Sequence, residues 1–282
     1  MDVRIQAEKA ERFRKLHHGP RMLLLPNAWD VASARILEEC GHPAIATTSA
    51  GIAYSLGHPD GQRISRGEML DVVGRIARAV RIPVTADLEA GYGTTPKDMA
   101  ETVKAAIEAG AIGMNLEDVT GDDENSQVAI PLQAEKIRVI RETAASLGVP
   151  FVLNARTDTY LMPIGPEPTR FERTVERLRA YRDAGADCLF APGLYDRDTI
   201  AKLVKAVEAP LNILATPAGP ALTEMEKIGV ARVSAGSGIM RAAMGAVQRV
   251  AKEMLEARSC ETMFAGAMPY IDLQRMMTRQ PS

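Results

Sequence analysis

Short apolar runs alternate with longer segments of helical spacing along most of the chain. Eight runs rich in aliphatic and β-branched residues occupy positions 22–25, 43–47, 82–86, 111–116, 150–154, 187–190, 211–215 and 230–234. Helical spacing follows them at about 28–40, 66–80, 96–109, 131–147, 167–184, 196–208, 221–228 and 237–258. Strands that alternate with helices favour a parallel sheet, and eight such units are the number that a closed (β/α)8 barrel of the TIM type needs.

Start and stop signals support these helices. Several begin at Pro, Ser, Thr or Asp, and three end on Gly110, Gly148 or Gly185 just before the next strand. A leading helix at about 4–18 and a Met-rich apolar tail lie outside the eight units. We therefore expect residues 1–282 to form one barrel domain, with 259–282 as a helical extension that is exchanged between subunits of a homo-oligomer.

Composition narrows the class of protein. The 282 residues carry a net charge of −2 and a pI near 6.2, so the chain has no basic excess that would bind nucleic acid. No apolar run approaches the roughly 20 residues of a membrane span, and the charged N-terminal residues do not resemble a secretory signal. Three widely spaced cysteines are typical of reduced, mostly buried thiols. These features predict a cytoplasmic protein without nucleic-acid or membrane partners.

The most informative motif follows the third predicted strand. Asp87 and Glu89 stand two residues apart where the apolar run 82–86 enters a glycine-rich turn. Residues i and i+2 of a strand point to the same side, so both carboxylates could share one cation if the extended geometry continues through Leu88. A set of oxygen ligands favours Mg²⁺, or alternatively Mn²⁺, over zinc. A helix cap or a solvated loop is the plainer interpretation.

Catalytic groups of such barrels come from the carboxyl ends of several strands. Residues 49–51 form a small-residue loop whose backbone N–H groups could bind a carboxylate or phosphate, although a tight turn explains them equally well. Asp60 lies in a turn, and Glu117 follows the fourth strand. Arg156 follows the buried fifth strand and needs an anionic partner, which could be Glu117, Asp158 or a substrate carboxylate.

Other chemistries have weaker support. The segment Ser234-Ala235-Gly236-Ser237-Gly238 could be a phosphate cradle or simply the start of a helix. The four histidines show no zinc-binding spacing, and the eight strand ends contain no lysine for a Schiff base.

Taken together, these strand ends resemble the isocitrate lyase and phosphoenolpyruvate mutase superfamily. The similarity runs from about Leu24 to Ala257. It is carried by Pro26-Asn27-Ala28-Trp29-Asp30, Ser49-Ala50-Gly51, Pro59-Asp60, Asp87-Leu88-Glu89-Ala90-Gly91-Tyr92-Gly93, Asn115-Leu116-Glu117-Asp118 and Ala155-Arg156-Thr157-Asp158. Members usually have aspartate where Glu89 stands.

The resemblance implies specific roles. Magnesium would be held, partly through water, by Asp87, Glu89 and Glu117, with Asp60 near the metal. Ser49, Ala50, Gly51, Tyr92 and Arg156 would bind a small carboxylate substrate, and Asp60, Glu117 and Arg156 would be the catalytic residues. The metal would act as a Lewis acid toward a 2-oxo acid enolate. Members tend to form dimers of dimers by exchanging a C-terminal helix.

The loop after the fourth strand departs from the family pattern. Lyases of the family carry a Lys-[Lys/Arg]-Cys-Gly-His motif there, but residues 119–131 contain no Cys, Lys or His. Phosphonate-processing members place lysine and asparagine there, and only Asn125 is similar.

Three functions remain open. The first is a magnesium-dependent lyase or decarboxylase that cleaves a C–C bond in a small 2-oxo or 2-hydroxy dicarboxylate, such as oxaloacetate or a methylisocitrate-like acid. The second is a phosphonate enzyme that cleaves a P–C bond. The third is a 2-oxo acid binding protein without turnover.

Overall fold

The computed structural model describes residues 2–121 and 127–278. Its strands are β1 (Leu23–Leu25), β2 (Asn27–Ala28), β3 (Ile45–Thr47), β4 (Val84–Asp87), β5 (Gly113–Leu116), β6 (Val152–Arg156), β7 (Cys188–Phe190), β8 (Leu211–Leu214) and β9 (Arg232–Ser234). All nine are parallel and lie in one sheet in the order β1-β9-β8-β7-β6-β5-β4-β3-β2. The predicted TIM-type barrel is confirmed.

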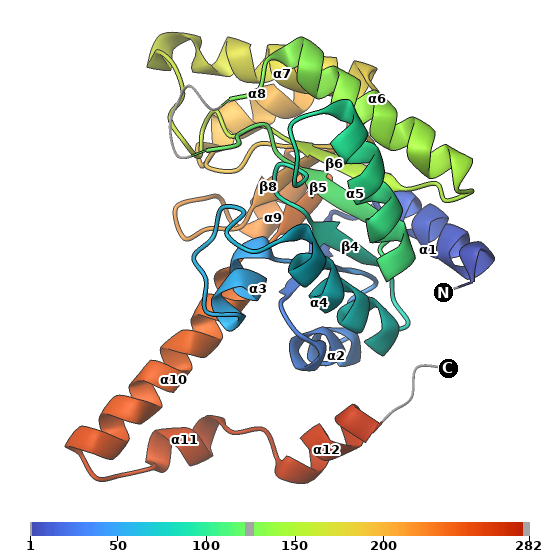
Figure 1. The fold of residues 1–282 in the computed structure, drawn as a ribbon. Helices are drawn as coiled ribbons and strands as arrows, with labels where there is room; N and C mark the ends of the chain where they lie inside the picture. The colour runs from blue at the N-terminus through green and yellow to red at the C-terminus, as the bar shows by residue number, and fades with distance from the viewer. Residues whose placement is uncertain (1, 122–126, 279–282) are drawn as a thin grey trace.

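Helices surround this sheet (Figure 1). They are α1 (Val3–Leu16), α2 (Val31–Glu39), α3 (Ser49–Ser55), α4 (Arg66–Ala79), α5 (Pro96–Ala109), α6 (Ile130–Ser146), the 3₁₀ turn η2 (Glu167–Thr169), α7 (Arg170–Asp183), α8 (Arg197–Val207), α9 (Leu222–Lys227), α10 (Gly238–Glu256), α11 (Glu261–Gly266) and α12 (Tyr270–Thr278). The segment at 49–51, expected as a loop, instead begins the short helix α3, because the Thr48 side chain accepts from the Gly51 N–H and caps it.

The barrel closes at a strand that proline divides. The first predicted strand, 22–25, corresponds to β1, and Pro26, which has no N–H to donate, separates it from a short strand, β2, that was not predicted. β1 pairs with β9 and β2 pairs with β3. Asn27 ties the two sides together, because its Oδ1 accepts from the Ala235 and Gly236 N–H groups at 2.9 Å and its Nδ2 donates to the Thr47 carbonyl at 2.7 Å.

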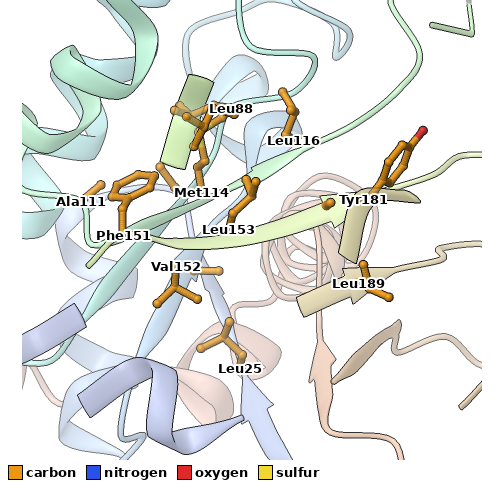
Figure 2. Close-up of a cluster of buried hydrophobic side chains, with 14 of the residues drawn as sticks. Leu25, Leu88, Ala111, Met114, Leu116, Phe151, Val152, Leu153, Tyr181 and Leu189 are labelled. Atoms are coloured by element: carbon orange, nitrogen blue, oxygen red, sulfur yellow. The ribbon is translucent and has the colours of Figure 1, made fainter. Parts of the chain in front are cut away.

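A large hydrophobic core lies between the sheet and its helices. Figure 2 shows Leu88, Met114, Leu116 and Leu153 among its members, and each of these is completely buried. Successive strand residues face opposite sides, so Met114 and Leu116 of β5 pack outward while Asn115 between them faces the barrel interior. That interior is therefore partly polar.

The C-terminal helices extend away from the barrel. α10 projects from the end of β9, and α11 and α12 return below α2 (Figure 1), where Arg35 of α2 donates to the carbonyls of Met276 and Met277. These three helices have exposed large apolar side chains, among them Leu255 at 75%, Phe264 at 74% and Tyr270 at 77%. We call residues 238–278 the C-terminal arm. Exchange of the extension at 259–282 between subunits stays a prediction.

The cysteines are less buried than the sequence predicted. Cys188 is buried, but Cys40 is exposed and Cys260 is half-buried, so the expectation of mostly buried thiols was wrong. Across the described ranges, every helix falls short of the combined length and apolar character that a bilayer span requires.

Candidate active site

A polar cavity opens at the carboxyl ends of the strands. Its volume is about 450 Å³, and the loops after β3, β4, β5 and β6 supply its walls. Its charged lining residues are Asp60, Arg63, Glu89, Glu117, Arg156 and Asp158, and Ser49 and Met162 also line it. This is the end of a parallel barrel where catalytic residues gather, so the cavity is the candidate active site.

Asp87 lies at the end of β4 beneath Ser49. Its Oδ2 accepts from the Ser49 N–H at 3.1 Å and from Ser49 Oγ at 2.9 Å, and its Oδ1 accepts from Asn115 Nδ2 at 3.2 Å. The Asp87 N–H donates to Thr47 Oγ1. These contacts fix the carboxylate in one orientation with only 9% of the residue exposed.

Glu89 reaches the cavity by a different route from the one that strand geometry predicts. β4 ends at Asp87, and Glu89 has a φ of 53°, so the extended geometry that the shared-cation prediction required does not continue to Glu89. The side chain is held instead by Gly61 and Gln62, whose N–H groups donate to Oε1, and by Tyr92, whose hydroxyl donates to Oε2 at 2.7 Å. Tyr92 therefore positions a carboxylate rather than lining the cavity itself.

Arg156 bridges two carboxylates from neighbouring loops. Its Nη1 lies 2.8 Å from Glu117 Oε2, and its Nε lies 2.6 Å from Asp158 Oδ1. The sequence left open whether Arg156 pairs with Glu117, with Asp158 or with a substrate carboxylate, and the structure shows that it pairs with both protein carboxylates. Nη2 makes no hydrogen bond within the described part of the chain, and Arg156 lines the cavity, so this nitrogen can still take a ligand carboxylate.

Negative charge exceeds positive charge around the cavity. Burial raises the pKa of Glu117 well above its ordinary value, although Arg156 acts in the opposite direction. Burial likewise raises the pKa of Asp158, of Asp60 and of Glu89, with Asp87 adding repulsion in each case. Carboxylates whose ionised forms are disfavoured by burial and by one another favour a bound cation.

The donor set fits a hard divalent ion, with one restriction. All candidate ligands are carboxylate oxygens, as Mg²⁺ prefers, and they carry the excess charge described above. Within residues 2–121 and 127–278, however, no three His, Cys, Asp or Glu side chains converge closely enough to hold a metal directly. Asp87, Glu89 and Glu117 each have separate protein partners, so water would have to complete the coordination shell.

The other candidate residues are distributed as follows. Ser49 lines the cavity, whereas Ala50 and Gly51 lie behind it in α3, and the Gly51 N–H is already bonded to Thr48. The loop at 235–238 does not offer a free phosphate cradle, because Asn27 accepts from two of its N–H groups. Asn125 lies outside the described residues.

Sequence reasoning missed three residues. Gln62 and Arg63 line the cavity from the loop after α3, and Asn115 contacts Asp87 from inside the barrel. The signal for Asn115 was available, because a polar amide inside an apolar strand needs a buried partner. Gln62 and Arg63 follow a turn, and nothing in their local pattern distinguishes them from solvated loop residues.

Comparison with known proteins agrees with this fold. Residues 13–255 match the protein family described as phosphoenolpyruvate phosphomutase. An uncharacterized protein of Mycobacterium tuberculosis is 34% identical over 93% of this chain and 94% of its own length. The 2-methylisocitrate lyase of Bacillus subtilis is 28% identical over 87% of this chain and 81% of its own.

Three solved structures share the architecture. A crystal structure described as a putative lyase/mutase from Burkholderia cenocepacia J2315 has a TM-score of 0.91 and 42% identity, with 98% and 97% of the two chains covered. Oxaloacetate acetylhydrolase with the product oxalate has a TM-score of 0.82 and 26% identity over 95% and 93%. Phosphonopyruvate hydrolase with oxalate and Mg²⁺ has a TM-score of 0.83 and 25% identity over 95% and 94%.

The fold and site thus define a (β/α) barrel with an acidic cavity at the carboxyl end of its sheet. The chain belongs to the phosphoenolpyruvate mutase family of the isocitrate lyase/phosphoenolpyruvate mutase superfamily. The resemblance read from the strand-end motifs is confirmed, and the relatives are C–C lyases and phosphonate enzymes.

Glu89→Gln should stabilise the metal-free protein at neutral pH. The amide can keep the bonds to Gly61, Gln62 and Tyr92 but removes a buried negative charge. The native pKa of Glu89 is raised above its ordinary value of 4.5, so its contribution to stability is present below that value and is lost as the pH rises through the native pKa. The gain in Tm should therefore grow above pH 4.5 and reach on the order of 2 °C.

Thermal unfolding in the presence of a chelator, at several pH values, measures this difference. Glu135→Gln, on the exposed face of α6, is the matched control and should have little effect at any pH. A Glu89→Gln protein that is less stable at pH 8 than at pH 5, relative to wild type, contradicts the charge argument.

Proposed function

We propose that this protein is a magnesium-dependent enzyme that cleaves a carbon–carbon bond as a lyase or a decarboxylase. Its substrate would be a small 2-oxo or 2-hydroxy dicarboxylate such as oxaloacetate or a methylisocitrate-like acid. The observation that carries the proposal is a small polar cavity in which one guanidinium nitrogen remains for a ligand carboxylate beside a surplus of buried carboxylates. Such a site suits an anion that binds together with a cation.

Asp87, Glu89 and Glu117 are the residues that would hold Mg²⁺, directly or through water, with Asp60 beside them. Mn²⁺ satisfies the same oxygen donors. The ion would supply a Lewis acid for the negative charge that develops on the 2-oxo oxygen during bond cleavage. The oxalate complexes of oxaloacetate acetylhydrolase and, with Mg²⁺, of phosphonopyruvate hydrolase support this assignment by similarity.

The chain's own side chains bind and orient the substrate. Arg156 would take a substrate carboxylate on Nη2, while Glu117 and Asp158 fix the plane of its guanidinium through the other two nitrogens. Ser49 donates to Asp87 and borders the same cavity, so it links the metal-binding carboxylate to the substrate wall. Ala50 and Gly51 would act behind this wall by fixing the start of α3.

The loop composition favours decarboxylation over a lyase reaction that needs a thiol. Residues 119–131 contain no cysteine, so the proton-transfer group of the standard lyase loop is absent from this sequence. When oxaloacetate loses the carboxylate on C3 as carbon dioxide, the bonding electrons pass into the 2-oxo group as an enolate, so no base is needed to remove a proton. C3 of the enolate can then be protonated by water or by a nearby side chain such as Asp60, whose pKa burial raises.

Turnover measurements distinguish the candidate functions. Purified protein is incubated with oxaloacetate, methylisocitrate or phosphonopyruvate, with and without Mg²⁺, and the products are separated and quantified. We expect magnesium-dependent consumption of oxaloacetate, with pyruvate as the product. Phosphate release from phosphonopyruvate would favour a phosphonate enzyme instead. No turnover, combined with tight magnesium-dependent oxalate binding, would favour a binding protein.

Asp87→Ala should abolish magnesium-dependent oxalate binding and leave the barrel folded. The variant removes the carboxylate that β4 places at the base of the site but no residue of the hydrophobic core. Isothermal titration of oxalate with and without Mg²⁺ measures the effect, and Asp71→Ala on the exposed face of α4 is the control. Unchanged oxalate affinity in Asp87→Ala would remove the metal assignment.

We further propose that the C-terminal arm packs against a second copy of the chain in a homo-oligomer, as a dimer of dimers. The arm exposes Leu255, Phe264, Tyr270 and Ile271, and the outer face of β1 leaves Leu24 exposed where the last helix of such a barrel usually packs. Apolar surface on both the arm and the barrel suits reciprocal exchange.

Light scattering coupled to size exclusion should therefore give a mass that is a multiple of the 30.5 kDa chain. A Leu255→Asp and Phe264→Asp double variant should shift the protein to a smaller species, because charge at these positions opposes apolar contact. Lys252→Asp on α10 is the control for charge alone. A wild-type protein that elutes as a monomer overturns the assembly.

A further inference from the structure

A buried guanidinium occupies the interior of the barrel below the active site. Arg232, at the start of β9, is completely buried and is the largest fully buried side chain of the described residues. Its Nη2 lies 3.4 Å from Asn115 Oδ1, and its Nε and Nη1 have no hydrogen-bond partner in the described part of the chain. Its guanidinium carbon lies 6.0 Å from the centre of the Phe13 ring of α1. A cation in this position needs a counter-charge.

The immediate neighbours of Arg232 are neutral. Burial, followed by repulsion from Arg232, lowers the pKa of His17 to about 3, so its ring is uncharged at neutral pH. Burial raises the pKa of Cys188 to about 12, so its sulfur remains a thiol. Asp87 is the carboxylate whose charge acts on Arg232.

Asn115 connects the two charges. Its Oδ1 accepts from Asn154 Nδ2 at 2.8 Å as well as from Arg232, so that end of the amide must be the acceptor. Nδ2 is thereby directed at Asp87 Oδ1, 3.2 Å away. Asn154 and Arg232 thus fix the orientation of the Asn115 amide, and this amide in turn holds Oδ1 of Asp87. The other oxygen is held by Ser49 from above.

We infer that Arg232 is a positioning residue of the metal site: through Asn115 it orients Asp87 and balances its charge from inside the barrel. The inference rests on the proposed function only in taking Asp87 as a metal ligand. Residues that orient metal ligands from behind commonly change metal affinity by 10–100-fold when they are altered. Arg232 makes no contact with the cavity itself, so its effect on a ligand must pass through Asn115 and Asp87.

The two explanations of Arg232 differ in the metal affinity that they predict for the folded variant. If Arg232 were needed only for folding, Arg232→Met would lower Tm and leave the metal affinity of the folded protein unchanged. If it positions Asp87, the same variant leaves that buried carboxylate without its orienting amide contact and its counter-charge, so the folded variant should bind metal more weakly whatever the change in Tm. Metal affinity should then fall by roughly tenfold.

The experiment measures Mn²⁺ binding to the full chain by electron paramagnetic resonance, without substrate, beside thermal unfolding of the metal-free protein. Arg232→Met should weaken Mn²⁺ binding and change the spectrum of bound Mn²⁺, and Arg232→Lys should restore part of the affinity. Asn115→Ala, which breaks the connection but keeps Arg232, should weaken binding in the same way and provides the test if Arg232→Met does not fold.

Arg141→Met is the matched control, because it also removes one guanidinium but one that pairs with Asp187. It should leave Mn²⁺ affinity unchanged. Wild-type binding that is retained in either Arg232→Met or Asn115→Ala overturns the positioning role and leaves the proposed function standing. Absence of Mn²⁺ binding by the wild-type protein overturns the metal assignment, and the role of Arg232 with it.

Discussion

Buried negative charge at the carboxyl end of the sheet is the constraint on which the site depends. Four acidic side chains line one small cavity, and a fifth lies directly beneath it. Burial raises the pKa of most of them, so each ionised carboxylate needs a donor or a cation close by. Each carboxylate has its own partners. Arg156 forms ion pairs with two of them, and backbone N–H groups and Tyr92 donate hydrogen bonds to Glu89. Ser49 and Asn115 donate to Asp87.

This arrangement explains why the polar network continues below the cavity. The interior of the barrel carries Asn115, Asn154 and Arg232 at positions where aliphatic residues would pack without polar cost. Placing a cation one amide away from Asp87 lowers the electrostatic cost of keeping that carboxylate ionised in a buried place. The carboxyl end of the sheet and the barrel core thus form one electrostatic system rather than a site resting on an inert scaffold.

The sequence predicted the barrel well, because eight apolar runs and their helix signals are local features with a strong period. It also predicted the positions of Glu117 and Arg156, since these residues lie at or just after the ends of buried strands, whereas Asp60 lies in the loop after α3. It could not predict how Glu89 reaches the cavity, because the left-handed backbone at this residue depends on donors from Gly61 and Gln62, nearly thirty residues earlier. Nor could it show that α10 leaves the barrel, since an amphipathic helix has the same pattern whichever surface covers it.

The proline that divides the first strand has a structural consequence for the cavity. Pro26 breaks the ladder at the point where the ring of strands closes, and the side-chain amide of Asn27 replaces the missing rungs by joining the loop after β9 to the end of β3. At the open end of the barrel, one side-chain amide therefore hydrogen-bonds to both sides of the seam. Because α3 and Ser49 follow β3 immediately, any stretching of this seam would be transmitted to the wall of the cavity within two residues.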